Sequence, residues 1–325
     1  MKRFSLIIIL SASLFASGQK RNVSFDISPQ QLALAITAKD STTLQKVTSI
    51  FNWVTSNIAY NVKAFGGGNQ RDVWLEEDDD TASPLKPLNQ RVSELVLKRG
   101  TAVCDGYARL FKTLCDAAGV YCETITGFAK TRTARIDARF TSNHKWNAVY
   151  IDSGWHLLDA TWASGYINYR NEFVYQYDAH FFLTPPAEFM MDHHPENLRW
   201  LLIADKPVAK EYAETPFKSS YFKTNYIRSF QPQSGIIEAA LGDTITFEIE
   251  PANPNKLLWV SASTLFDSLD IFLLQCCGAV KPQNKITGNK VSCIYKIESE
   301  NTEWLHLIYD DQMIMRYKIN VKKNL

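Results

Sequence analysis

The hydrophobic pattern of this chain changes period at Gly119, and that change limits the folds the chain can adopt. Before Gly119, the segment TAVCDGYARLFKTLCDAAG carries apolar residues at helical spacing. After it, three segments have the character of strands: VYCETITGF, HKWNAVYI and WHLLDATW. Asp152-Ser153-Gly154 separates the last two and is a turn signal. The pattern predicts a helix followed by strands, two of which form an antiparallel hairpin.

Further helices are expected on the N-terminal side. Ser28-Pro29 followed by QQLALAITAKD predicts a short helix with proline in its first turn. An amphipathic helix with a Ser or Thr cap is expected from Ser41 to Ile58, because its apolar residues recur at helical spacing. Val92, Leu95 and Val96 indicate another helix that ends near Gly100. The acidic run from Glu76 to Asp80 lacks the alternating ligands of a calcium loop, so we interpret it as a solvated loop.

The pattern of apolar and turn-forming residues changes again near Glu211. Short β-like runs then follow one another, separated by Pro, Asn, Gly and Asp: DTITFEIE, KLLWVSA, IFLLQCC, KVSCIYKIE, TEWLHLIY and MIMRYKINVK. Such spacing predicts a small all-β sandwich, immunoglobulin-like in general shape. With 325 residues, the chain is long enough for two domains. We predict one over residues 19–210 and the sandwich over residues 211–325.

The first 18 residues have the features of a secretory signal peptide. Lys2 and Arg3 precede a short apolar stretch, and Ala16-Ser17-Gly18 supplies small residues before a cut ahead of Gln19. The stretch is shorter than the roughly 20 residues that a membrane span needs. We therefore expect an exported protein, periplasmic or secreted, without a membrane span.

Six cysteines follow the predicted cleavage site, and an oxidising compartment would permit disulfides among them. Cys115 and Cys122 flank a helix end and could form a disulfide, and Cys293 could pair with Cys276 or Cys277. Alternatively, these residues are buried reduced thiols that pack as small hydrophobes. Both interpretations stay open.

The charges nearly cancel, with 35 Lys and Arg against 34 Asp and Glu. A net charge of +1 offers no electrostatic footprint for nucleic acid or for an anionic membrane. Partners of those two kinds are therefore not expected.

Three residues carry a pattern that suggests chemistry: Cys104, His144 and Asp159. Cys104 lies where the predicted helix starts, and there the unpaired N–H groups and the helix dipole favour the thiolate. His144 begins one strand of the hairpin and Asp159 ends the other. A cysteine nucleophile needs a base within hydrogen-bond reach, and the base needs a third group that fixes its tautomer.

The register of the hairpin decides whether His144 and Asp159 meet. They lie directly opposite each other only if the loop is centred on Ile151-Asp152. A two-residue Ser153-Gly154 loop would offset them by four residues, about 13 Å at the rise of a strand. We therefore expect a longer loop or a bulge if the two residues meet.

Three segments closely resemble the transglutaminase-like superfamily, in particular the branch that includes kyphoscoliosis peptidase and related bacterial exported proteins. They are TAVCDGYARLFKTLCDAAGV, NHKWNAVYIDSGWHLLDATW and YDAHFFLTPPAEFMMDHHPENLRWLL. The shared pattern is Cys-[Asp/Glu]-Gly-Tyr-Ala, then His-x-Trp-Asn, then Asp-Ala-Thr-Trp, and every element is present. The resemblance covers about residues 41 to 205.

This resemblance implies a papain-like α+β core in which the nucleophile helix packs on an antiparallel sheet. Carried over by motif, Cys104 is the nucleophile, His144 the general base and acid, and Asp159 the orienting carboxylate. Trp162 would shield the His–Asp hydrogen bond from water. An oxyanion donor is also required; the backbone N–H of Cys104 is one candidate, and the side chains of Tyr60 and Trp74 are weaker candidates.

The other histidines are interpreted as structural. His193 and His194 precede Pro195, so we expect them in a loop, facing solvent rather than a metal. His156 is expected to be a surface or packing residue, and His180 a structural one.

The function expected from the resemblance is acyl transfer from a peptide bond or a Gln carboxamide through a thioester on Cys104. Hydrolysis of the peptidase type is preferred; transglutaminase or deamidase activity, or a non-catalytic binding module on the same fold, are the alternatives. The expected partner is a protein or peptide substrate, with a cell-wall peptide as one class. No cofactor and no metal are implied.

Overall fold

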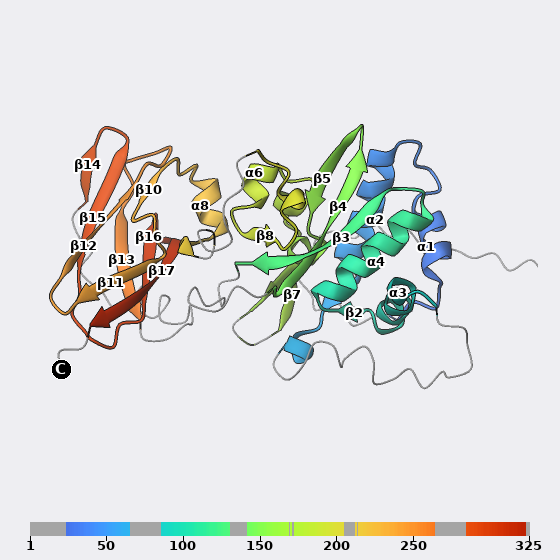
Figure 1. Ribbon diagram of the computed structural model, residues 1–325, viewed down its shortest axis with the longest axis horizontal. Helices are drawn as coiled ribbons and strands as arrows, with labels where there is room; N and C mark the ends of the chain where they lie inside the picture. Colours follow the sequence, from blue (N-terminus) through green and yellow to red (C-terminus); the bar gives the residue numbers. More distant parts are fainter. Residues whose placement is uncertain are drawn as a thin grey trace, which may run out of the picture.

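The computed structural model describes residues 24–65, 86–130, 142–168, 170, 172–204, 212, 214–263 and 284–322. Two groups of elements lie side by side, each around its own hydrophobic core (Figure 1). We call them the N-terminal group, up to residue 204, and the C-terminal group, from β9 onward. The predicted signal peptide, the acidic run, Trp74, Cys276 and Cys277 lie outside the described residues.

The four predicted helices of the N-terminal group are confirmed. They are α1 (Pro29–Ile36), α2 (Thr43–Asn57), α3 (Leu88–Arg99) and α4 (Cys104–Ala117). The N-termini of α1 and α2 carry capping boxes, in which Ser28 pairs with Gln31 and Thr42 with Gln45. Helix α3 ends at Gly100, whose φ of 64° is the left-handed conformation that glycine adopts most readily.

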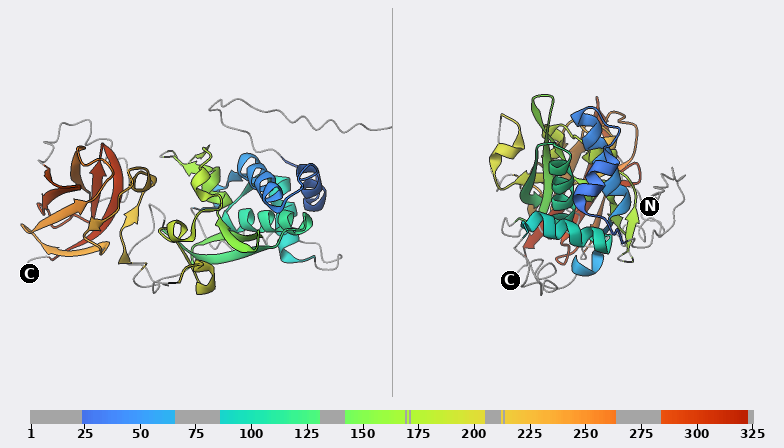
Figure 2. Two further views of the ribbon diagram at one scale, coloured as in Figure 1. Left: turned by 90° about the horizontal axis from the view of Figure 1, so that it is seen from above. Right: turned by 90° about the vertical axis from the view of Figure 1, so that its right-hand side faces the viewer.

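A four-stranded antiparallel sheet forms the centre of the N-terminal group. Its strands are β3 (Cys122–Ala129), β4 (His144–Ile151), β5 (Gly154–Leu158) and β8 (His193–Pro195), in the order β5-β4-β3-β8. Helix α4 packs on β3 and β4, and α1, α2 and α3 pack around α4 (Figures 1 and 2). The structure thus has the predicted α+β core, with the helix that starts at Cys104 lying on an antiparallel sheet.

Shorter elements connect these parts. Strands β1 (Ala59–Tyr60) and β2 (Thr101–Ala102) pair in parallel, which ties the end of α2 to the start of α4. The remaining elements of the N-terminal group are η1 (Val62–Phe65), α5 (Ala160–Ser164), β6 (Gly165–Ile167), β7 (Phe173–Tyr175), η3 (Ala179–Phe181), α6 (Pro186–Phe189) and η4 (Leu198–Leu201).

Two details of the predicted hairpin are wrong. The last predicted strand stops at Leu158, and Asp159 caps the short helix α5 instead, because its carboxylate accepts hydrogen bonds from backbone N–H groups there. The turn consists of Asp152 and Ser153, both with positive φ, and Gly154 already pairs with Ile151. Two residues with positive φ form the tight turn that suits the twist of a hairpin, so neither a longer loop nor a bulge is needed.

The C-terminal group is rich in strands, as predicted. Its elements are β9 (Phe217–Lys218), α8 (Ser220–Thr224), β10 (Phe230–Gln231), β11 (Ile236–Ala240), β12 (Thr244–Ile249), β13 (Leu258–Ser263), β14 (Lys285–Thr287), β15 (Lys290–Lys296), β16 (Trp304–Tyr309) and β17 (Gln312–Lys322). Two sheets, β10-β12-β15-β14 and β11-β17-β16-β13 with β9 on β17, contribute to one core. The immunoglobulin-like shape and the boundary at residues 210 and 211 stay predictions, and IFLLQCC lies outside the described residues.

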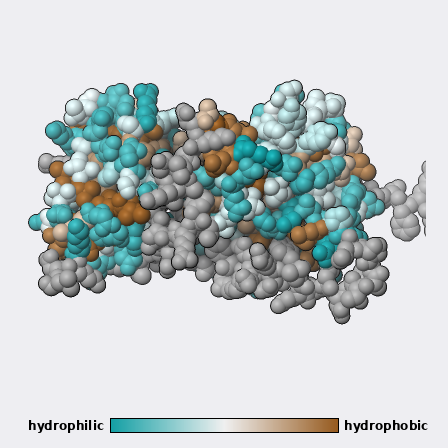
Figure 3. Space-filling model, viewed as in Figure 1, coloured by the Kyte–Doolittle hydropathy of each residue, from teal (hydrophilic) through white to brown (hydrophobic). Residues whose placement is uncertain are grey.

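The surface of the described part is mixed in character. The face in Figure 3 is largely hydrophilic, with hydrophobic patches near α6 and over the C-terminal strands. Among the described residues, no helix is long and apolar enough to cross a membrane.

The described cysteines are free thiols. Cys115, Cys122 and Cys293 are all buried and unbridged, so the proposed Cys115–Cys122 disulfide is wrong. Burial, followed by a hydrogen bond with Cys122, raises the pKa of the Cys115 thiol well above its ordinary value. These two cysteines pack as small hydrophobes.

Candidate active site

Cys104 is the first residue of α4 and is buried. The preceding residue, Val103, is extended and provides no side-chain cap, so the N–H groups of the first turn are not taken up by a capping side chain. The parallel β1–β2 pair sets this helix start, with Ala59 N–H donating to Gly100 and Asn61 N–H to Ala102. A sulfur at this position lies in the positive field of the helix N-terminus.

His144 and Asp159 form a buried pair. The Nε2 atom of His144 lies 2.6 Å from Oδ2 of Asp159, whose side chain is 1% exposed. In the observed register Asn147 pairs with Leu158, which places His144 and Asp159 two residues apart along the hairpin. Diagonal neighbours on one face of a hairpin are within reach of side chains of this length.

The second oxygen of Asp159 is used by the backbone. Its Oδ1 accepts hydrogen bonds from the N–H groups of Thr161 at 2.8 Å and Trp162 at 3.1 Å. The first turn of α5 therefore fixes the plane of the carboxylate and directs Oδ2 at the imidazole.

The electrostatics favour an ion pair between these residues. Burial alone would lower the pKa of His144, but the charge and hydrogen bond of Asp159, with smaller contributions from Cys104, raise it to about 10. Burial alone would raise the pKa of Asp159, and His144 and then His193 hold it well below its usual range. Since Nε2 of His144 is hydrogen-bonded to Asp159, Nδ1 is the ring nitrogen that remains for an interaction with the Cys104 thiol.

Tyr60 and Trp162 lie beside the residues of this candidate site. Burial and then the charges of Cys104 and Asp159 raise the pKa of the Tyr60 phenol, so the hydroxyl keeps its proton and can donate a hydrogen bond. The ring of Trp162 lies 5.4 Å from that of His144, where it covers one side of the pair. Trp74 lies outside the described residues.

His193 was missed as a site residue, and its predicted exposure is wrong. His193 and His194 are each 1% exposed and form strand β8, which pairs with the end of β3. The Nε2 atom of His193 lies 3.1 Å from Oδ2 of Asp159, and its Nδ1 atom lies 2.7 Å from Oδ1 of Asp192. Burial results from pairing with a strand more than 60 residues earlier, which a local pattern does not report. The acidic residue directly before the two histidines was the available signal.

These side chains also have the composition of a metal site, since one ligand atom from each of His144, Asp159 and His193 lies within 4.8 Å of the others. Ligands of a tetrahedral zinc ion, bound at about 2.0–2.1 Å, lie about 3.3 Å apart. The His144–Asp159 distance of 2.6 Å is shorter than that and is typical of a charge-assisted hydrogen bond. We therefore interpret the cluster as a hydrogen-bond network.

Part of the chain is similar to known proteins. The sequence model of the transglutaminase-like superfamily matches residues 30–160, a range that includes Cys104, His144 and Asp159. Kyphoscoliosis peptidase of Mus musculus is 30% identical over 252 residues, which are 76% of this chain and 35% of that protein. The Homo sapiens protein is 32% identical over 222 residues, 67% of this chain and 31% of that protein.

Residues 30–160 belong to the transglutaminase-like superfamily. The chain spans about a third of the length of these kyphoscoliosis peptidases. A crystal structure of a TGase is 19% identical, with a TM-score of 0.27, and the match covers 43% of this chain and 31% of that one.

The transglutaminase-like region supports acyl transfer or peptidase chemistry in general terms. The superfamily match ends at residue 160, directly after Asp159. Asp192 and His193 therefore lie beyond it, although they contact the same carboxylate.

Proposed function

We propose that the chain catalyses acyl transfer on peptide or Gln carboxamide bonds through a thioester on Cys104, with water as the usual acceptor. The observation that supports this most directly is the buried His144–Asp159 pair, 2.6 Å between Nε2 and Oδ2, whose histidine also interacts with Cys104. A raised pKa keeps the imidazole protonated, which is the state that stabilises a thiolate beside it.

In the first half-reaction, the Cys104 thiolate attacks the carbonyl carbon and forms a C–S bond, while the carbonyl electron pair moves to oxygen. The N–H groups at the start of α4 and the Tyr60 hydroxyl are the candidates for stabilising this oxyanion. The C–N bond then breaks, and the leaving nitrogen takes the proton from His144. An amine, or ammonia from a Gln carboxamide, departs.

In the second half-reaction, His144 removes a proton from water, and the resulting hydroxide adds to the thioester. Collapse of this intermediate expels the Cys104 thiolate and leaves a carboxylic acid and a protonated imidazole. If a lysine amine takes the place of water, the product is an isopeptide bond and the enzyme is a transglutaminase. Asp159 holds the imidazole in one orientation throughout and stabilises its charge.

The alkylation rate of Cys104 by iodoacetamide, followed by peptide mass spectrometry from about pH 4 to about pH 9, tests the proposal. We expect rapid labelling below pH 7 that is lost in His144→Ala. Cys115→Ala is the matched control, because Cys115 is a buried thiol of the same helix away from His144. Labelling of Cys104 that rises only near pH 8.5, where an ordinary cysteine ionises, would contradict the proposal.

Assays of substrate turnover distinguish hydrolysis, transglutaminase activity, deamidation and a binding module without activity. Casein, a Gln peptide with a labelled amine, and cell-wall stem peptides would be offered to the wild type and to Cys104→Ala. Release of acid products supports hydrolysis, amine incorporation supports transglutaminase activity, and ammonia without incorporation supports deamidation. No turnover and no low-pH labelling would favour a binding module. We further propose that the protein acts after export, on periplasmic or extracellular substrates.

A further inference from the structure

The carboxylate of Asp159 contacts a second imidazole, that of His193, in addition to His144. Its Oδ2 atom contacts Nε2 of His144 at 2.6 Å and Nε2 of His193 at 3.1 Å. A nucleophile, a base and one orienting acid need only the first of these contacts. His193 is therefore an additional group whose orientation affects the same oxygen.

The ring of His193 is held on every side. It stacks on Phe189 with centroids 4.1 Å apart and lies 4.5 Å from Trp162 and 5.0 Å from Trp146. Both of its nitrogens face carboxylates, Asp159 on one side and Asp192 on the other. An imidazole has two N–H donors only when protonated, so both contacts are hydrogen bonds when His193 carries a positive charge. These contacts join Asp192, His193, Asp159 and His144 in one row.

Asp192 is held in turn from the C-terminal group. Its Oδ2 atom accepts a hydrogen bond from Nζ of Lys223 at 3.1 Å, and the same amine lies 2.5 Å from Nε2 of His180. Lys223 belongs to α8. The residue before it in the same helix, Phe222, is part of the hydrophobic core of the C-terminal group. Helix α8 lies on the side of that group that faces α6 and β8 (Figure 1).

The charges around Asp192 favour this arrangement. Burial would raise the pKa of Asp192, but its hydrogen bonds and charge interactions with His193 and Lys223 lower it. Burial and the charge of Lys223 lower the pKa of His180, so its Nε2 can accept from the ammonium. Lys130 and Lys218 also lie near Asp192. Burial lowers the pKa values of both lysines, and the negative charge of Asp192 raises them in part.

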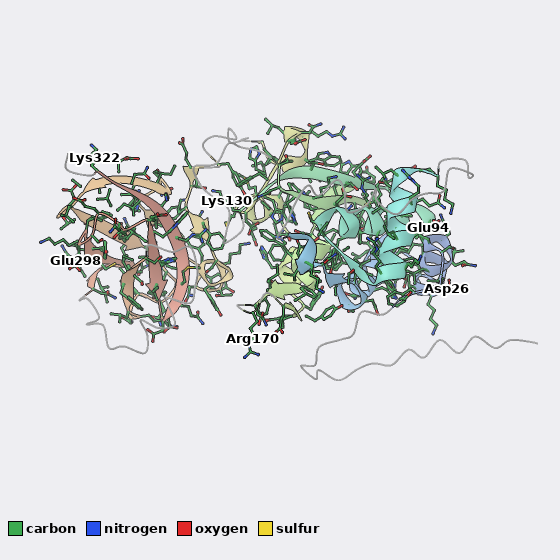
Figure 4. All side chains as sticks on the ribbon, turned by 90° about the horizontal axis from the view of Figure 1, so that it is seen from below. Asp26, Glu94, Lys130, Arg170, Glu298 and Lys322 are labelled. Carbon is green, nitrogen blue, oxygen red and sulfur yellow. The ribbon has the colours of Figure 1, made fainter. Side chains whose placement is uncertain are left out.

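A second contact lies close to Asp192, whose backbone oxygen accepts from the N–H of Lys130. Lys130, at the end of β3, donates from Nζ to the backbone oxygen of Thr215 at 2.9 Å and lies 4.4 Å from the ring centre of Tyr212. Figure 4 shows Lys130 between the two groups of elements. Thr215 and Tyr212 belong to the segment that connects the two groups, so this contact holds the connecting segment next to the row that leads to Asp159.

We propose that Asp192 and His193 are positioning residues for the Asp159–His144 pair, and that Lys223 of the C-terminal group keeps Asp192 in place. The C-terminal group thus contributes to the active site through a buried row of hydrogen bonds. This inference rests on the proposed function, because it assigns roles around the same site. Loss of Lys223 leaves Asp192 with one fewer hydrogen bond and allows His193, and then Asp159, to move.

The test uses the full chain and the hydrogen bond itself. The Nε2 proton of His144 is followed by NMR in protein labelled at histidine, and its exchange with water is measured at pH 6. In Lys223→Met we expect this exchange to be roughly tenfold faster or more. Lys223→Arg should restore slow exchange. Lys218→Met is the matched control, because it removes another positive charge near Asp192 while the Lys218 amine lies over the rings of Phe222 and Phe230.

A double variant decides whether Lys223 acts through Asp192. In an Asp192→Asn background, Lys223→Met should add little further change, since the step that transmits its effect is already removed. An equal effect in both backgrounds would overturn the proposal, as would unchanged exchange in a folded Lys223→Met protein. A wild type without a protected Nε2 proton would also overturn it.

Two further outcomes are separable. If Lys223→Met does not fold, His193→Gln takes its place and must show the same faster exchange, and slow exchange there would refute the role of His193. If wild-type Cys104 is not alkylated below pH 7 while Lys223→Met still speeds exchange, the proposed function fails and the positioning row stands.

Discussion

His144 contacts Asp159 across a hairpin offset of two residues, with Nε2 and Oδ2 2.6 Å apart. The contact depends on the Asp152-Ser153 turn, which sets the register, and on the capping of α5, which fixes the carboxylate. Shifting the register by one residue would send the two side chains to opposite faces. The turn and the cap therefore determine the geometry of the site as much as the two side chains do.

Asp159→Asn should retain the fold and lose most of the activity. Asparagine can still cap α5 through its side-chain oxygen, but it no longer stabilises a protonated His144. We expect kcat for acyl transfer to fall by roughly a thousandfold or more, by analogy with serine-protease triads. Steady-state kinetics, with circular dichroism to check the fold, measures this. A folded Asp159→Asn protein with near wild-type kcat would exclude Asp159 as the orienting residue.

Tyr60→Phe tests the oxyanion assignment. The Tyr60 hydroxyl keeps its proton because burial and the charges of Cys104 and Asp159 raise its pKa. Removal of one oxyanion donor costs roughly 10²–10³ in kcat, and KM should change little because the charge forms only in the transition state. Tyr166→Phe, at an exposed tyrosine, is the control. A drop in kcat/KM that comes from KM alone would assign Tyr60 to substrate binding instead.

Stability should fall as pH rises above neutrality because of His144. Its folded-state pKa of about 10 exceeds the ordinary value of about 6.5 in an unfolded chain. Its contribution is therefore complete below pH 6.5 and is lost as pH rises through about 10. Asp159, whose folded-state pKa is depressed, contributes above about pH 4 and loses its contribution as pH falls through that depressed value. Both describe one ion pair, so the two contributions are not added.

The measurement is the free energy of unfolding in urea at pH 6 and pH 9, for wild type and His144→Gln. The wild type should lose on the order of 3 kcal/mol more than the variant between these two pH values. Lys130 acts in the opposite sense, since burial and the charge of Lys218 lower its pKa to about 7. Both proteins retain Lys130, so its contribution cancels in the comparison. An equal loss of unfolding free energy between pH 6 and pH 9 in the two proteins would mean that His144 does not form the ion pair in solution.

The sequence motifs predicted Cys104, His144 and Asp159, because each stands at a boundary between elements that local pattern reveals. Cys104 follows a glycine-ended helix, and His144 opens a strand. The end of the last strand was misplaced, since Asp159-Ala160-Thr161-Trp162 continues an apolar pattern although Asp is a preferred helix cap. The predicted turn signal Asp152-Ser153-Gly154 contains the observed turn but left its register open, because glycine is the usual occupant of a positive φ and here Asp152 and Ser153 adopt it.

His193 could not be predicted in the same way. Its three-residue strand is too short to show alternation, and the following proline favours a loop. Burial comes from pairing with Ala129 in β3, and the contact with Asp159 comes from a third segment. Lys223 lies further still from the motifs, so its link to Asp192 depends on how the two groups pack.

Gly127→Ala should damage both stability and activity, because β3 passes close to β8 at this residue. A Cβ at Gly127 would lie 2.4 Å from the backbone oxygen of His194, 2.4 Å from the ring of Trp146 and 2.8 Å from Cα of Pro195. Backbone atoms cannot move away as the tip of a side chain can, so β8 must shift, and it carries His193 with it. We expect a loss of about 1–3 kcal/mol in the free energy of unfolding, typical of overpacking.

The matched control is Gly154→Ala in the same sheet, where the nearest atom to a Cβ is Nε2 of His156 at 3.7 Å. That variant should be near neutral in urea unfolding and in Cys104 alkylation. At a temperature where Gly127→Ala is fully folded, its low-pH alkylation of Cys104 should still be slower than in wild type, because displacement of β8 disturbs His193 and, through it, Asp159. Wild-type alkylation in a destabilised but folded Gly127→Ala protein would show that the position of β8 does not affect the site.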